Sequence, residues 1–123
     1  MKVAVSAAGN SEEALVDPRF GRCTWFALCD TQADTVNFIE NAAASASGGA
    51  GLAAAQQMID KDVEAVITGS AGPNAYNVLR NSDIRIYRCG SVPVRTAVQL
   101  LREAKLEEVT SAGPSHAGMG GGR

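Results

Sequence analysis

Short apolar runs alternate with polar and glycine-rich stretches along this chain of 123 residues, and the runs have two different periods. Short runs rich in valine, isoleucine and phenylalanine are typical of strands, whereas apolar residues that recur every three or four positions are typical of helices. The pattern predicts strands at residues 3–7, 23–29, 35–40, 64–68 and 84–87, and helices at residues 52–61, 75–81 and 94–105.

The order of these elements predicts how the strands are arranged in a sheet. Residues 30–34 fit a hairpin connection between the second and third strands, so the first three strands form an antiparallel meander. The later elements alternate between helix and strand, as βαβ units do. Because parallel crossovers are right-handed, the meander lies on one side of the first strand and the crossover on the other. We therefore expect an α/β, single-domain ribonuclease H-like fold: a five-stranded mixed sheet of order 3-2-1-4-5 with three helices.

The composition predicts one folded domain followed by a tail. Hydrophobic residues make up 46% of the chain and charged residues 20%, which is enough apolar surface for a single core. Residues 111–123 hold five of the 13 glycines and show no apolar periodicity, so burial cannot offset the entropy of ordering them. We expect a ribonuclease H-like domain at residues 1–110 and a flexible glycine-rich tail at residues 111–123.

The charge and the cysteine pattern exclude several classes of protein. A net charge of -2 argues against a nucleic-acid or anionic-membrane binder, because both need clustered lysine and arginine. No apolar run approaches the roughly 20 residues of a membrane helix, and the N-terminus enters a strand pattern directly. Three cysteines without a Cys-x-x-Cys pair indicate neither a disulfide framework nor a zinc site. We expect a cytoplasmic protein with reduced thiols and no nucleic-acid or membrane partner.

Residues 17–23 carry the richest chemistry, because the sequence DPRFGRC places two cations, a glycine and a thiol directly before a strand. Glycine-rich turns follow at 48–51 and 69–74, at strand–helix junctions where α/β proteins build ligand sites. Their glycines either expose N–H groups to an anion or serve turn geometry alone, and Asn74 could instead cap the following helix. We expect the three loops to form one anion-binding site. Its candidate residues are Arg19, Phe20, Gly21, Arg22, Gly49, Gly51, Gly69, Gly72 and Asn74.

Three residues are candidate metal ligands: Cys23, Cys89 and His116. A thiolate at Cys23 suits an iron–sulfur cluster and the adjacent Arg22 would lower its pKa, although Cys23 could also be a small core residue. The predicted topology places Cys23 and Cys89 at one edge of the sheet, about 14 Å apart at about 4.8 Å per strand. They could grip opposite sides of a cluster. His116, the sole histidine, either folds back to complete the coordination or stays in solvent.

The motifs resemble, in order and spacing, the dinitrogenase iron-molybdenum cofactor biosynthesis domain over residues 1–105. They are DPRFGR at 17–22, GAG at 49–51, VITG at 66–69 and GPNA at 72–75. The family has a ribonuclease H-like fold and includes NifX-like carriers of nitrogenase cofactor precursors, the C-terminal domain of the NifB-like synthase, and small stand-alone proteins. The resemblance implies non-catalytic binding and transfer or storage of an iron–sulfur cluster or iron-molybdenum cofactor precursor. It also implies cluster assembly or acceptor proteins as partners of a monomer or homodimer.

One position departs from the family pattern, because its cofactor carriers tend to read Asp-x-His-Phe-Gly where this chain has Arg19. A guanidinium stays protonated, so it donates hydrogen bonds to anionic sulfides rather than ligating metal. Catalysis is not expected, since the first strand carries no acid for a divalent metal and no Ser-His-Asp or Cys-His arrangement is visible. The alternative is a metal-free small-anion-binding or protein-interaction regulatory module that uses the same three loops.

Overall fold

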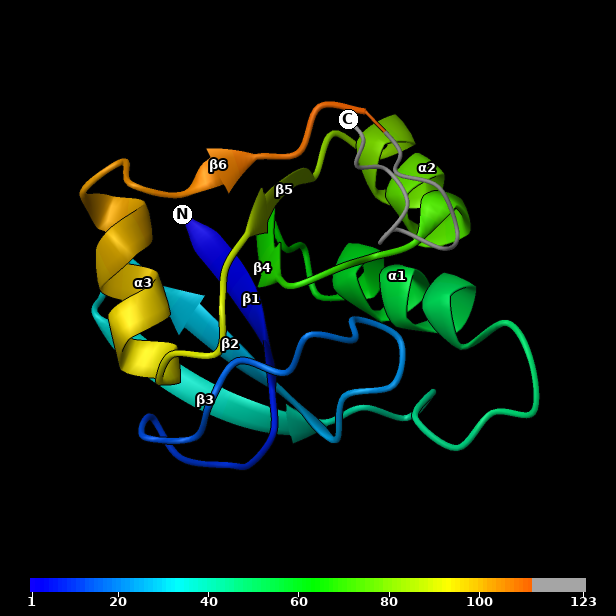
Figure 1. The fold of residues 1–123 in the computed structure, drawn as a ribbon, viewed down its shortest axis with the longest axis horizontal. Helices are drawn as coiled ribbons and strands as arrows, with labels where there is room; N and C mark the ends of the chain where they lie inside the picture. Colours follow the sequence, from blue (N-terminus) through cyan, green and yellow to red (C-terminus); the bar gives the residue numbers. More distant parts are fainter. Residues whose placement is uncertain (112–123) are drawn as a thin grey trace.

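The computed structural model describes residues 1–111, in which one sheet lies between α1 and α2 on one face and α3 on the other (Figure 1). Apart from Ser111, the expected tail lies outside the described residues. None of the described helices is long and apolar enough to cross a membrane. The elements are β1 (Lys2–Ala7), β2 (Trp25–Asp30), β3 (Thr35–Glu40), α1 (Ala50–Asp60), β4 (Ala65–Thr68), α2 (Pro73–Asn81), β5 (Arg85–Arg88), α3 (Val94–Arg102) and β6 (Glu107–Glu108).

The order of the strands confirms the predicted α/β fold and extends it by one strand, to β3-β2-β1-β4-β5-β6. β1 pairs antiparallel with β2 and parallel with β4, so the meander and the crossover lie on opposite sides of β1 as expected. The sequence pattern missed β6, because its two glutamates carry no apolar signal and pair only with the end of β5. The prediction that the second strand starts at Cys23 was two residues early, since β2 begins at Trp25.

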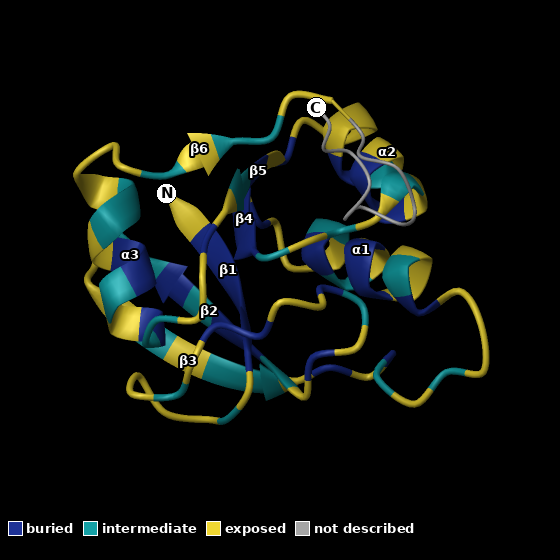
Figure 2. Cartoon of the chain, in the orientation of Figure 1, coloured by how far each residue is buried: buried dark blue, intermediate teal, exposed yellow. Residues whose placement is uncertain are grey.

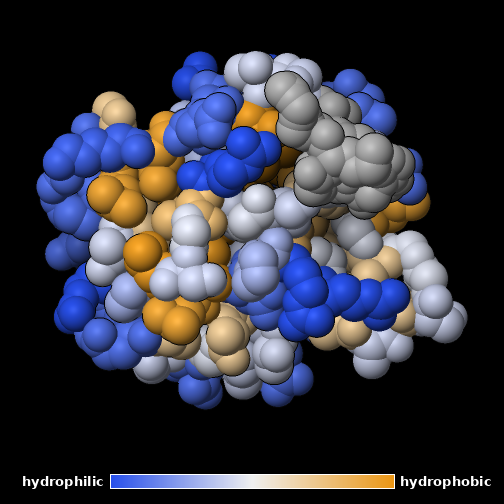
Figure 3. Space-filling view, in the orientation of Figure 1, coloured by the Kyte–Doolittle hydropathy of each residue, from blue (hydrophilic) through white to orange (hydrophobic). Residues whose placement is uncertain are grey.

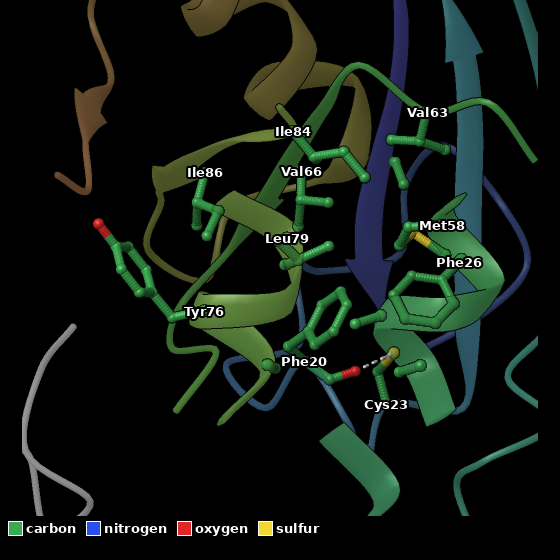
Figure 4. Packing of buried hydrophobic residues seen from close by; sticks show 14 of the residues in the cluster. Phe20, Cys23, Phe26, Met58, Val63, Val66, Tyr76, Leu79, Ile84 and Ile86 are labelled. Atoms are coloured by element: carbon green, nitrogen blue, oxygen red, sulfur yellow. Dashed lines mark hydrogen bonds between the residues drawn. The ribbon is translucent and has the colours of Figure 1, made fainter. Parts of the chain in front are cut away.

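Two hydrophobic cores flank the sheet, because successive side chains of a strand point to opposite faces. Val3 and Val5 of β1 belong to the core under α3, whereas Ala4 belongs to the core under α1 and α2. Figure 2 shows that β1 and β4 are buried along nearly their whole length. Phe26 of β2 packs on Phe20 in the core under α1 and α2, with ring centroids 5.4 Å apart (Figure 4). The central strands are therefore covered on both faces.

The core under α1 and α2 predicts the cost of truncating Leu79, which is fully buried. We expect Leu79→Ala to lower the free energy of unfolding by about 2–5 kcal/mol, through lost transfer energy and an unfilled cavity. Urea denaturation followed by circular dichroism measures the change. Leu52→Ala is the matched control, because the Leu52 side chain is 45% exposed and its loss should cost less than about 1 kcal/mol. Equal losses in the two variants would contradict this description of the core.

Candidate functional site

Three loops meet at the edge of the sheet where β1 and β4 end and β2 begins. The motif loop comprises residues 17–23 and leads into β2. The α1 loop (48–51) and the α2 loop (69–74) lead into α1 and α2, which begin beside each other at the right of Figure 1. Because β2 is antiparallel to β1 and β1 is parallel to β4, the topology brings all three loops to one edge.

Glycines let the motif loop pack directly against the backbone of the other two loops. A Cβ atom on Gly21 would lie 2.8 Å from the backbone nitrogen of Gly51, at the start of α1. A Cβ atom on Gly69 would lie 2.7 Å from the Cα atom of Pro18. Real Cβ atoms do not approach backbone this closely, so both positions require glycine unless the loops separate. The structure therefore joins the three loops into one unit by close packing.

Buried polar groups fix the first half of the motif loop to the ends of β1 and β4. The Ser6 hydroxyl donates a hydrogen bond of 2.6 Å to the carbonyl of Asp17 and lies 2.7 Å from the Thr68 hydroxyl. The N–H of Asp17 donates in return to the Ser6 carbonyl at 2.8 Å. Ser6, Asp17 and Thr68 are all buried. The sequence pattern did not single out Ser6 or Thr68, whose signal is a hydroxyl residue near the end of an otherwise apolar strand.

Asn41 fixes the second half of the motif loop. Its side-chain amide donates to the carbonyls of Gly21 at 3.0 Å and Cys23 at 2.9 Å. Its side-chain oxygen accepts from the N–H of Ala43 at 3.0 Å and from the Gln57 amide of α1 at 2.9 Å. Asn41 is buried, so it joins the motif loop to α1 in a site shielded from water. The sequence analysis missed it, and an asparagine directly after a strand is the only sequence signal it gives.

Phe20 anchors the motif loop in the core and does not line a binding surface. Its side chain is only 1% exposed and packs on Phe26 (Figure 4). Its N–H donates a hydrogen bond of 3.1 Å to the Ser70 carbonyl of the α2 loop. Phe20, predicted as a binding residue, therefore positions its neighbours in the motif loop.

Cys23 is fully buried in the core under α1 and α2, and its thiol donates to the Phe20 carbonyl at 3.3 Å (Figure 4). Burial raises the pKa of Cys23 to about 12, so the expectation that Arg22 lowers it was wrong. Cys89 lies in the other core, under α3. The expectation that both thiols grip one cluster was also wrong, because the sheet separates them. His116 lies outside the described residues, among which no three His, Cys, Asp or Glu side chains form a metal-binding group.

The two arginines of the motif loop have different partners. Arg19 donates through Nε to the nearly buried Asp17 carboxylate at 3.3 Å, and this hydrogen bond raises the pKa of Arg19. Its side chain nevertheless stays 67% exposed. Arg22 donates to the carbonyls of Ala44 and Ala46, at 3.1 and 2.6 Å, and so holds the segment before α1. Figure 3 shows a strongly hydrophilic surface where the motif loop passes below α1.

A pocket of about 230 Å³ lies between the starts of α1 and α2, lined by residues 49–52 and 71–75. Gly49 and Gly72 are the N-cap residues, with φ of 70° and 77°, and neither helix has a side-chain cap. The first N–H groups of each helix therefore lack a side-chain acceptor, which together with the helix dipoles favours an anion. Asn74, a predicted site residue, lines this pocket and is exposed in the first turn of α2, so the alternative in which it caps this helix was wrong.

The hydrogen bonds of Asn41 predict the effect of removing its side chain. We expect Asn41→Ala to lower the free energy of unfolding by about 1–3 kcal/mol, because the buried carbonyls of Gly21 and Cys23 lose their donor. We also expect Asn41→Ala to speed up amide hydrogen exchange in the motif loop more than in the rest of the domain, relative to the unsubstituted protein. Asn77→Ala, at an exposed position of α2, is the control and should change neither quantity. Unchanged stability and exchange in Asn41→Ala would show that the motif loop does not depend on this amide.

The raised pKa of Cys23 predicts a loss of stability at high pH. The thiol titrates at about 12 in the folded protein against an ordinary value of 9.0, so the unfolded chain releases this proton first. The free energy of unfolding should therefore fall as the pH rises from about 9 towards about 12. Denaturant titrations across this range should show a shallower fall for Cys23→Ala than for the unsubstituted protein. Identical slopes would contradict a thiol held protonated by burial.

Solved structures show the same architecture. The orange protein from Desulfovibrio gigas, in its apo form, is 31% identical to this chain, covers 90% of it and 94% of its own chain, and superposes with a TM-score of 0.86. A Thermotoga protein described as a candidate NifB protein is also 31% identical, covers 89% of this chain and 94% of its own, and has a TM-score of 0.79.

Sequence comparison extends the similarity to nearly the whole described domain. An uncharacterized protein of Methanocaldococcus jannaschii is 29% identical over 111 residues, which are 88% of this chain and 91% of the relative. The profile of the family described as dinitrogenase iron-molybdenum cofactor matches residues 1–104, a range that contains the motif loop and both glycine loops. The chain therefore belongs to the dinitrogenase iron-molybdenum cofactor family.

Proposed function

We propose that this protein is a non-catalytic binder that receives an anionic metallocluster and hands it to another protein. The cargo is an iron–sulfur cluster or a precursor of the iron-molybdenum cofactor, as family membership suggests. The observation that carries the proposal is the pocket between two helix N-termini without side-chain caps. The α2 loop forms a backbone bridge at Ser70 with Arg19 of the motif loop, whose side chain is exposed. The partners are cluster assembly and acceptor proteins.

The pocket suits an inorganic anion in size and in chemistry. Its volume of about 230 Å³ equals that of about eight water molecules at ~30 Å³ each, enough for a small cluster and too little for a large organic cofactor. Backbone N–H groups at a glycine turn donate hydrogen bonds to the sulfides of iron–sulfur clusters as well as to phosphate. Arg19 adds guanidinium donors at the motif loop, although the paired Asp17 carboxylate offsets its charge and limits where the guanidinium moves.

Weak protein ligation fits a cargo that is passed on. Residues 49–52 and 71–75 supply no thiol, imidazole or carboxylate to the pocket. Cys23, the ligand expected from the sequence, is buried and protonated, so ligation by its thiolate would require the core to open. We therefore assign retention to backbone donors and Arg19, which release a cluster without breaking a bond between protein and metal. The same lining offers no acid–base pair, in keeping with a non-catalytic role.

The test is anaerobic reconstitution with ferrous iron and sulfide, followed by visible absorbance and by iron and sulfide analysis. We expect stoichiometric uptake, and roughly tenfold weaker retention in Arg19→Gln, which loses a charge-assisted hydrogen bond. Arg95→Gln is the control, because Arg95 is about as exposed as Arg19 and is also paired with a carboxylate, that of the exposed Glu13. An equal loss of cluster retention in both variants would indicate a general charge effect and contradict a specific role of Arg19 at the site.

Cys23→Ala separates the two modes of holding the cargo. We expect uptake to persist in this variant, because the thiol is not at the pocket. Loss of uptake with unchanged circular dichroism would instead assign Cys23 as a ligand and overturn retention by backbone donors. A colourless protein after reconstitution, with sulfate or molybdate binding detected by calorimetry, would replace the cluster carrier with a metal-free anion-binding module.

A further inference from the structure

We propose that the free edge of β3 is a homodimer interface, at which β3 pairs antiparallel with β3 of a second copy of this chain, with Phe38 on the twofold axis. The proposal rests on the edge itself and is independent of any cargo. It follows from three observations: the contrast between the two edges of the sheet, the direction of the free backbone groups of β3, and the single register that suits its side chains.

The two edges of the described sheet are protected to very different degrees. β6 closes one edge with only Glu107 and Glu108, and short acidic edge strands resist pairing with another chain. β3 forms the other edge over six residues, TVNFIE, with no proline, no lysine and an unbroken register with β2. A long, regular edge strand without these devices is a template for strand addition.

The outward backbone groups of β3 can be assigned from the pairing with β2. The N–H of Asn41 donates to the Thr24 carbonyl, directly before β2. Because hydrogen-bonded pairs alternate along an antiparallel ladder, residues 35, 37, 39 and 41 of the β3 segment form the hydrogen-bonded pairs with the β2 segment. The N–H and C=O groups of Val36, Phe38 and Glu40 then point away from β2. No other described strand pairs with that side of β3. Three residues thus present donors and acceptors to a partner strand.

Apolar side chains accompany these free groups. Val36 and Phe38 pack against the core under α3, and Ile39 packs against the core under α1 and α2. All three are only half-buried, so each leaves apolar surface at the edge. A partner strand would remove part of this surface from water on both faces of the sheet, which stabilises association.

The register of self-pairing is determined by the faces of the sheet and by charge. Side chains of directly opposed residues must lie on the same face, which allows Phe38 opposite Phe38 of the second copy, with Val36 opposite Glu40. Shifting by two residues in one direction would set Glu40 opposite Asp34, a like charge at a position that leaves the strand with φ of 58°. Shifting by two in the other direction would set Val36 opposite Ala42, which lies beyond the end of β3. The first register opposes no like charges and uses all three outward residues.

The inferred assembly is a closed dimer. Twofold pairing of β3 consumes the long edge of both copies and leaves only the two β6 edges exposed. Those edges are too short to continue the sheet. Because six backbone hydrogen bonds and a few side chains form a small interface, we expect a weak dimer whose population rises with protein concentration.

Sedimentation velocity of the full chain over a concentration series tests the proposal. We expect a concentration-dependent shift from monomer to dimer. Phe38→Lys should abolish it, because two ammonium groups would meet at the twofold axis. Val36→Pro should also abolish it by removing an outward donor while keeping the pairing with β2. Asn77→Lys, a change at an exposed position of α2, is the control and should dimerise like the unsubstituted protein.

A cross-linking variant tests the register directly. Phe38→Cys should form an intermolecular disulfide on mild oxidation, since opposed residues of an antiparallel hydrogen-bonded pair have Cα atoms about 5.5 Å apart. The three natural cysteines are buried and should not cross-link under the same conditions. A monomer at every concentration, or dimers that persist in both Phe38→Lys and Val36→Pro, would overturn the proposal.

Discussion

The absence of a side chain at two glycines determines the geometry of the whole site. Gly21 of the motif loop packs against the backbone at the start of α1. Gly69, directly after β4, packs against Pro18 of the motif loop. At both distances no Cβ atom fits. The atoms they meet are mainly backbone, which cannot rotate away as a flexible side chain would. Separation of these segments would move the motif loop away from the starts of α1 and α2. The relative positions of the three loops therefore depend on these two contacts.

Buried hydrogen bonds turn this close packing into a fixed scaffold. Ser6 and Asn41 hold opposite ends of the motif loop, and each satisfies carbonyls that would otherwise be buried without a donor. Phe20 fills the space between these anchors and the core. The burial of Cys23 follows from the same arrangement, because the residue lies between two anchored segments. A motif that reads as a thiolate site in the sequence is, in the fold, a rigid support for the exposed Arg19.

The sequence predicted the fold well because apolar periodicity and connection rules determine strand order. The β3-β2-β1-β4-β5 order follows from one hairpin and right-handed crossovers, whereas β6 has no apolar pattern and forms only by pairing with β5. The meeting of the three loops was also predictable from the topology. The burial of Cys23 was not, since adjacency to a charged motif says nothing about tertiary packing. Asn41 was equally invisible, because its partners Gly21, Cys23 and Gln57 lie 16 to 20 residues away in the sequence.

A site made of backbone donors and one guanidinium selects its ligand differently from a thiolate site. Thiolates form strong bonds to metal and retain a cluster until another thiol displaces them. Backbone N–H groups at the starts of α1 and α2 respond only to the charge, the size and the surface atoms of an anion. Such a site tolerates clusters of different metal content and releases them when an acceptor offers stronger ligands. Under the proposed carrier function, the acceptor would determine the direction of transfer, and the scaffold would not need to change shape to release the cluster.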